Sequence, residues 1–152
     1  MGALLDRDRK PPTSIMSLPP SLEKIVKRFK GASSNKLRYE QLLWYAKKLP
    51  EFPESEKLPG NKVQGCVSQV YIISSLDEEG NISYRGDSDA QLTKGLVAFL
   101  IEGLNGSTPK TVSELGPDFI QETGLTVSLT PSRANGFYNI FKFMQERAKS
   151  YL

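Results

Sequence analysis

The 152-residue sequence has no histidine and a single cysteine, Cys66. Without histidine the chain can form no Ser-His-Asp or Cys-His pair, no histidine-bearing zinc site and no histidine proton shuttle. One cysteine allows no internal disulfide, which fits a reducing compartment, and supplies too few ligands for a zinc or iron–sulfur site made by this chain alone. These absences remove histidine-dependent catalysis and zinc or iron–sulfur sites bound by this chain alone, whereas carboxylate chemistry remains open.

Long apolar runs and dense basic clusters are also missing. No run approaches the ~18 residues of a membrane span. The formal net charge is +3, and the basic residues are spread among acids without a nucleic-acid-binding motif. Residues 1–16 lack the apolar stretch of a secretory signal and read as a flexible tail, as a shortened transit segment or an expression remnant also would. We therefore expect one domain over residues 17–152, with neither membrane nor nucleic acid as partner.

The hydrophobic pattern predicts helices at both ends of the domain. One helix should begin at Pro19-Pro20 and end at Gly31, and a second should follow the capping cluster Ser33-Ser34-Asn35 and end before Pro50. Short helices are expected over about 109–115 and 117–123, and a last helix behind Thr130-Pro131. Trp44 and Tyr45 share a helix with buried leucines, so we expect both in the core or a cavity wall.

A small antiparallel sheet should lie between these helices. Val63–Leu76 and Ile82–Arg85 read as a hairpin, with a third short strand possible before Cys66. Ser88 to Gln91 matches a capping box at the start of another helix, which Leu92, Leu96, Phe99 and Leu100 would continue. The fold class is therefore α+β, with about three strands and the helices on one face of the sheet.

Cys66 is the leading candidate for chemistry, although a lone cysteine is often a small buried hydrophobe. Gly65 directly before it allows a sharp turn or a close approach by another chain. The upstream loop, with Pro53, Pro59 and Gly60, is the kind of segment on which reactive groups are displayed. Lys62 adds a positive charge, which would lower the pKa of the thiol.

Three ordered segments resemble the SufE family. They are Val63-Gln64-Gly65-Cys66-Val67-Ser68-Gln69-Val70; Gly86-Asp87-Ser88-Asp89-Ala90 with Lys94-Gly95-Leu96; and Ser128-Leu129-Thr130-Pro131-Ser132-Arg133 with Asn135-Gly136. The similarity runs from about Leu18 to the C terminus and is closest to the cyanobacterial and plastid branch of the family.

The resemblance implies a fold shared with the scaffold proteins of the IscU/NifU group. It also implies that Cys66 accepts persulfide sulfur from a SufS-type cysteine desulfurase, activates that enzyme and passes the sulfur to the SufB-SufC-SufD scaffold for iron–sulfur cluster assembly. The desulfurase would hold pyridoxal phosphate, and this chain would bind no cofactor and no metal and would not be an independent catalyst. Family members carry the acceptor thiol on a loop that can tuck into an apolar cavity. The compartment would be the cytoplasm of a bacterium or the plastid stroma, and a homodimer is left open.

Other residues of these segments have both functional and structural interpretations. Arg133 stands at the family's arginine position, where it could favour thiolate or partner docking near Cys66, or simply be solvated or paired with a carboxylate. Asp87 and Asp89 could be helix-start acids or could contact the partner together with Gly65 and Lys62. Ser68, Thr130 and Ser132 lack a histidine base, so we expect them to cap helices and bond loops.

Two rival functions remain at this point. The chain could be a docking or regulatory module for a desulfurase or scaffold that never carries sulfur. It could also be a thiol-dependent hydrolase or redox sensor, but the missing histidine and the missing resolving cysteine count against both.

Overall fold

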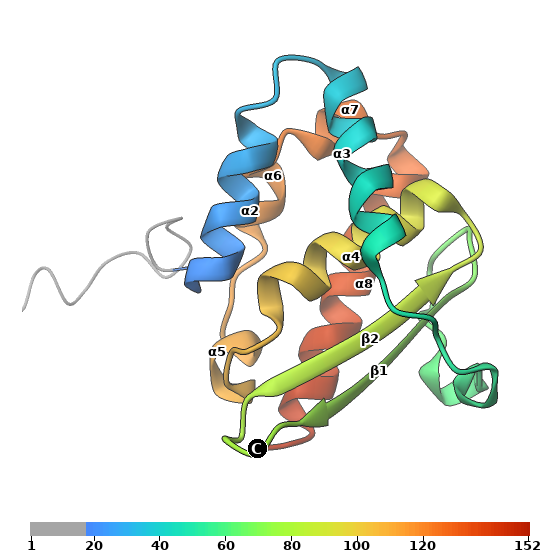
Figure 1. Cartoon of the computed structure of the whole chain (residues 1–152), viewed down its shortest axis with the longest axis vertical. Coiled ribbons are helices and arrows are strands. Elements are labelled where there is room, and N and C mark those ends of the chain that lie inside the picture. The colour runs from blue at the N-terminus through green and yellow to red at the C-terminus, as the bar shows by residue number, and fades with distance from the viewer. Residues whose placement is uncertain (1–17) are drawn as a thin grey trace, which may run out of the picture.

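A computed structural model describes residues 18–152 of the chain, so the tail predicted for residues 1–16 lies outside the described residues. Helices come first, a hairpin follows, and helices complete the fold (Figure 1). The elements in order are α2 (Pro20–Lys30), α3 (Asn35–Lys48), the 3-10 helices η2 (Glu54–Glu56) and η3 (Pro59–Asn61), β1 (Val70–Leu76), β2 (Ile82–Ser88), α4 (Gln91–Leu104), α5 (Pro109–Ser113), α6 (Asp118–Glu122), α7 (Leu125–Ser128) and α8 (Pro131–Lys149). The predicted α+β class is confirmed.

The local signals set most helix ends. The Ser34 and Thr130 hydroxyls accept hydrogen bonds from the backbone N–H groups of Leu37 and Arg133, and so cap α3 and α8. Gly31 follows α2, and α3 ends at Lys48 because Leu49, which precedes a proline, is extended. α7 is a short helix that the sequence pattern did not predict.

The sheet has two strands rather than about three. β1 and β2 pair antiparallel with Val70 opposite Ser88 and Leu76 opposite Ile82. The expected third strand is reduced to one isolated bridge between Lys62 and Tyr71, because the chain turns into the Cys66 loop at once. Burial alternates along β2 and the first half of β1, so one face of the sheet is more deeply buried than the other.

The predicted capping box is wrong. Ser88 is the last residue of β2, and its hydroxyl accepts a hydrogen bond from the Ala90 N–H. Ala90 occupies the N-cap of α4 without a side-chain cap, so the helix begins at Gln91. Pairing of Ser88 with Val70 holds the serine in the sheet, and this strand contact overrides the local capping pattern.

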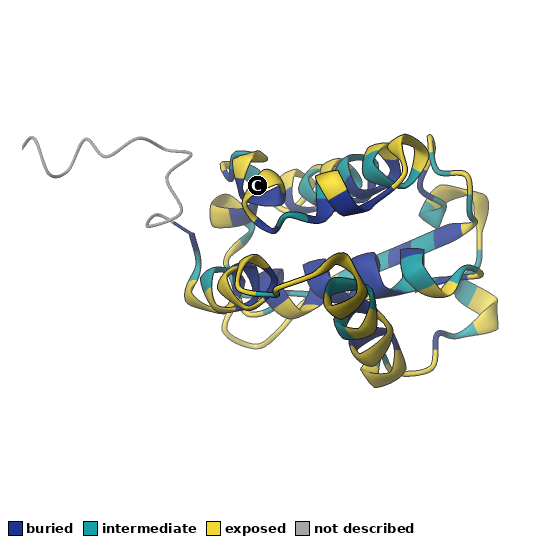
Figure 2. Cartoon of the chain, turned by 90° about the horizontal axis from the view of Figure 1, so that it is seen from above, coloured by how far each residue is buried: buried dark blue, intermediate teal, exposed yellow. Residues whose placement is uncertain are grey.

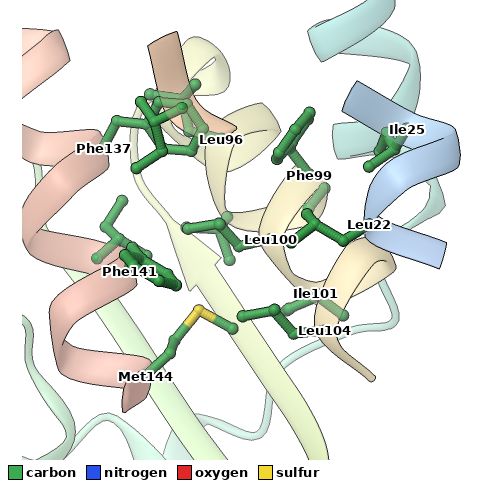
Figure 3. Packing of buried hydrophobic residues seen from close by; sticks show 14 of the residues in the cluster. Leu22, Ile25, Leu96, Phe99, Leu100, Ile101, Leu104, Phe137, Phe141 and Met144 are labelled. Carbon is green, nitrogen blue, oxygen red and sulfur yellow. The ribbon is translucent and has the colours of Figure 1, made fainter. Parts of the chain in front are cut away.

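α4 is the centre of the core. It packs against α2, α3, α8 and β2, and its apolar side chains meet Leu22 of α2 and Phe137, Phe141 and Met144 of α8 (Figure 3). Gly95 allows α3 to approach α4, since a Cβ at this position would lie 2.5 Å from the Leu42 carbonyl oxygen. Figure 2 shows the buried residues inside the helical layers and the exposed ones on their outer faces.

Tyr45 lies in the core and Trp44 lines the wall of two surface hollows, so each of the two residues takes one of the predicted positions. The side chain of Trp44 is 51% exposed, whereas that of Tyr45 is 6% exposed. Neighbouring helical residues point about 100° apart, so only one of the two rings can face the interior. Tyr45 takes that position and packs against Phe29.

Candidate functional site

Cys66 lies on a short loop that joins η3 to β1. The Val63 N–H donates to the Val70 carbonyl over 2.9 Å, which closes residues 64–69 into a hairpin loop. Gly65 has a φ of 82°, a left-handed conformation that favours glycine, so the predicted sharp turn before the thiol is present. The turn places Cys66 against the first turns of α8, where it is half-buried.

A small set of hydrogen bonds holds this loop. The Asn139 Nδ2 group of α8 donates to the Gly65 carbonyl over 2.9 Å. At the other end, the Gln69 N–H donates to Asp89 Oδ1 over 3.0 Å, and the Asp89 N–H donates to the Gln69 carbonyl over 3.2 Å. Gln64, Gly65, Val67 and Gln69 are exposed, so the loop is bound mainly at its two ends.

The thiol borders a cavity of about 260 Å³ between the loop, the start of α4 and the start of α8. Cys66 Sγ donates a weak hydrogen bond to the Gly136 carbonyl over 3.7 Å. The cavity is lined by Cys66, Val67, Ser68, Thr93, Thr130, Ser132, Arg133 and Gly136. The thiol is therefore part of the cavity wall, and serine and threonine hydroxyl groups make another part of this wall polar.

Arg133 shares this cavity with Cys66. Its Nη1 group donates to the Thr93 hydroxyl over 2.8 Å, and the Thr93 and Ser68 hydroxyls are 3.3 Å apart. Among the described residues Arg133 forms no salt bridge, and none of the residues lining the cavity is acidic. Within residues 18–152 no carboxylate therefore pairs with Arg133, and its guanidinium lines the same cavity as the thiol.

Burial raises the pKa of the Cys66 thiol above its ordinary value. The expectation that Lys62 lowers this pKa is wrong for this conformation, because desolvation alone shifts it. Burial disfavours the charged form, so the enclosed thiol stays neutral to a higher pH than a free cysteine. In this position Cys66 therefore forms less of the nucleophilic thiolate than a free cysteine does.

The other predicted site residues lie outside the cavity. Asp87 is between Lys57 and Lys94, with a distance of 3.5 Å to each ammonium. Asp89 bonds the end of the loop at Gln69, and Lys62 bridges to Tyr71 in the stem of the hairpin. Both acids precede Ala90, the N-cap of α4, so they lie next to the start of the helix rather than in its first turn.

Three residues at the site were missed by the sequence reasoning. Thr93 bonds Arg133, Gly136 accepts from the thiol, and Asn139 holds Gly65. A buried threonine on a helix that is otherwise rich in leucine was a usable signal for Thr93. Gly136 belongs to the third family segment but was given no role, and Asn139 lies outside the three segments. Both act through contacts across about seventy positions of sequence.

Two kinds of feature are absent from the described residues. Within residues 18–152, no helix is long and apolar enough to cross a membrane. The same residues contain no group of three or more histidine, cysteine, aspartate or glutamate side chains that could hold a metal ion.

Comparison with known proteins places this geometry in a family. The SufE family, described as an Fe-S metabolism associated domain, matches residues 23–148. A SufE-like protein of Synechocystis sp. is 64% identical over 135 residues, which cover 89% of this chain and 84% of the relative. SufE-like protein 1, chloroplastic/mitochondrial, of Arabidopsis thaliana is 46% identical over 88% of this chain and 36% of its own length.

Two further relatives extend the comparison. The cysteine desulfuration protein SufE of Plasmodium falciparum is 37% identical over 82% of this chain and 52% of its own length, so the chain spans only part of this protein and of the Arabidopsis one. The solution structure of a hypothetical protein from Thermus thermophilus superposes with a TM-score of 0.75 at 27% identity, covering 88% of this chain and 96% of that one. With the family match and the Synechocystis relative together, the chain belongs to the SufE family.

Proposed function

We propose that Cys66 accepts sulfane sulfur from a SufS-type cysteine desulfurase and that this chain thereby activates the enzyme. The observation that carries the proposal is the position of the only thiol, on a loop bound mainly at its ends and facing a cavity that holds the charge of Arg133. The name of the Plasmodium relative, cysteine desulfuration protein, supports the same role.

The transfer needs no base from a histidine. The Cys66 thiolate attacks the terminal sulfur of the donor's cysteine persulfide, and a new S–S bond forms at Cys66. The S–S bond of the donor breaks, and its electron pair leaves on the donor cysteine as thiolate. The step is formally a thiol–disulfide exchange, so neither an oxidant nor a reductant is consumed.

The position of the thiol demands that it move before it reacts. Burial raises the pKa of Cys66, and only the thiolate is the nucleophile. Docking of the desulfurase would draw the loop away from α8, break the contact with Gly136 and return the thiol to solvent-like surroundings. Val67, which follows the thiol and is 84% exposed, would be the first side chain to touch the partner.

Arg133 would act on the same step without contacting a carboxylate. Its guanidinium is held at the cavity by Thr93, so it can face an anionic sulfur on Cys66 or on the donor. Gly65 and Asp89 would contribute by shaping the two ends of the loop, and Lys62 and Asp87 by lying on the surface next to it.

The partners follow from the chemistry that this chain lacks. The desulfurase would supply pyridoxal phosphate, which activates free cysteine, and the SufB-SufC-SufD scaffold would receive the sulfur from Cys66. This chain would then be a sulfur carrier and activator rather than an independent catalyst. It would work in the cytoplasm of a bacterium or in the plastid stroma, where its partners are.

The test uses the full chain, a SufS-type desulfurase and free cysteine. Intact-mass measurement should show a gain of one sulfur atom that a reductant removes, and Cys66→Ser should show no gain and no stimulation of the desulfurase. If Cys66→Ser stimulates the desulfurase as well as the natural chain does, the protein is a docking module and the carrier role is wrong.

The role of Arg133 has its own test. Arg133→Ala should slow sulfur uptake several-fold, because the anionic sulfur loses its only cationic neighbour in the cavity, and Arg133→Lys should recover part of the rate. Lys142→Ala is the matched control, since it removes an exposed cation from the same helix without touching the cavity. Equal rates for Arg133→Ala and Lys142→Ala would show that the arginine is only structural.

A further inference from the structure

A second functional surface surrounds Trp44, the only tryptophan of the chain. Two hollows, of about 320 and 360 Å³, flank its ring on the outer side of α2 and α3. Arg28, Trp44 and Tyr45 line both hollows, so the two are continuous. With its side chain 51% exposed, Trp44 is a large aromatic group that the fold itself leaves half uncovered.

The first hollow is cationic. Lys24, Arg28 and Lys48 line it, and none of the three has a carboxylate within 4.0 Å among residues 18–152. The ammonium of Lys48 lies 4.3 Å from the centre of the Trp44 ring and 5.6 Å from that of Tyr45. Glu102 is the single acid in this hollow, so its lining carries a net positive charge.

The second hollow is more apolar. Leu37, 40% exposed, lies in it beside the ring of Trp44, and Glu40 is its one acidic residue. Arg28 crosses between the hollows and donates to the Tyr45 hydroxyl over 2.9 Å, which fixes both side chains. Tryptophan, tyrosine and arginine held in place around a hollow are the residues that dominate the binding energy of protein interfaces.

This surface is separate from the Cys66 cavity. The two share no lining residue, and α4 contributes Thr93 to the cavity and Glu102 to the cationic hollow. These two residues are nine positions apart, which on a helix places them on opposite sides and about 14 Å apart along the axis. A partner on the Trp44 surface would therefore leave the thiol accessible.

We propose that the Trp44 surface docks an acidic protein segment that carries one large apolar side chain. Carboxylates of the segment would pair with Lys24, Arg28 and Lys48, and its apolar side chain would cover Trp44 beside Leu37. A nucleic acid fits less well, because Glu40 and Glu102 would repel a continuous phosphate backbone and one ring offers no series of stacking positions. The inference does not depend on sulfur transfer by Cys66.

Fluorescence gives a direct test, since all tryptophan emission comes from Trp44. The full chain is titrated with a set of short tryptophan-free peptides in which aspartate and glutamate flank one leucine or phenylalanine. At least one peptide should shift the emission to shorter wavelength in a saturable way. Matched peptides with asparagine and glutamine in place of the acids should bind about tenfold more weakly, the equivalent of about 1.4 kcal/mol.

Charge reversal locates the site. Lys24→Glu and Lys48→Glu should each weaken the acidic peptide about fivefold or more, because an attraction is replaced by a repulsion. Lys110→Glu, at an exposed lysine of α5 that lines neither hollow, is the matched control and should bind as the natural chain does. Circular dichroism checks that each variant is folded.

Three outcomes would overturn the proposal. One is that no peptide of the set changes the emission, and another is that neutral and acidic peptides bind equally. The third is that a single-stranded oligonucleotide displaces the acidic peptide and binds more tightly. Cys66→Ser should bind the peptide normally, so a failure of the sulfur-carrier role and a failure of this surface are distinguishable.

Discussion

Replacing Asn139 by alanine should release the Cys66 loop. The only hydrogen bond that α8 donates to the loop backbone runs from Asn139 Nδ2 to the Gly65 carbonyl over 2.9 Å. Asn139 also lies against Gly65, where a Cβ would come within 2.5 Å of Nδ2. The hydrogen bond from Asn139 to Gly65 is therefore a contact next to the thiol that replacement of one side chain removes.

The size of the effect follows from the net strength of one hydrogen bond. Such a bond contributes about 0.5–1.5 kcal/mol in a protein, so its loss should raise the ratio of open to closed loop about two- to tenfold. When opening and closing are fast, the rate of thiol alkylation follows the population of the open form. The alkylation rate of Cys66 by iodoacetamide should rise by the same factor.

The assay follows the mass of the intact chain during alkylation at fixed pH. Asn135→Ala is the matched control, because Asn135 is an exposed asparagine of the same helix whose side chain forms no hydrogen bond among the described residues. Asn139→Asp should open the loop at least as far, since a carboxylate oxygen would face the Gly65 carbonyl. If Cys66 is alkylated no faster in Asn139→Ala than in Asn135→Ala while both variants are folded, the hydrogen bond from Asn139 to Gly65 does not hold the loop closed.

Other predictions concern the thiol and the core. The alkylation rate of Cys66 should have its pH midpoint above the ordinary thiol pKa of about 8.5, because burial favours the neutral form, and the midpoint should fall toward that value in urea. Gly95→Ala should lower the free energy of unfolding by about 1–3 kcal/mol in urea titrations, since its Cβ would meet the Leu42 carbonyl oxygen at 2.5 Å. Tyr84→Phe should cost about 1 kcal/mol by the same measurement, because the buried hydroxyl donates to the Met144 carbonyl over 2.5 Å.

The predictions that held rest on local chemistry. Pro131 and the capping hydroxyl of Thr130 mark the start of α8, and Pro50 explains the end of α3. Each of these effects acts within one helical turn. The turn at Gly65 was expected for the same reason, since only glycine adopts its φ without strain. Such signals involve a few neighbouring residues, so a single sequence contains them in full.

The predictions that failed depend on contacts between distant segments. Ser88 matches the sequence pattern of a helix cap, but its pairing with Val70 places it in strand β2. The prediction of core or cavity wall held for both Trp44 and Tyr45, but which of the two rings is buried depends on the packing of α3 on Phe29 and could not be predicted. The pKa of Cys66 was expected to fall because Lys62 is near in sequence, whereas burial against α8 raises it.

The arrangement around Cys66 would meet two opposing demands of the proposed sulfur transfer. A sulfur carrier must keep its thiol from oxidants and competing thiols, and it must also present a thiolate to its partner. Burial meets the first demand by keeping the thiol neutral, and the cost is low reactivity in the closed loop. Because Arg133 is held by the neutral Thr93 hydroxyl rather than by a carboxylate, its charge remains available when an anionic sulfur reaches the cavity. In the proposed function, protection would lie in the loop position and activation in the cavity wall, so each should change separately when Asn139 or Arg133 is replaced.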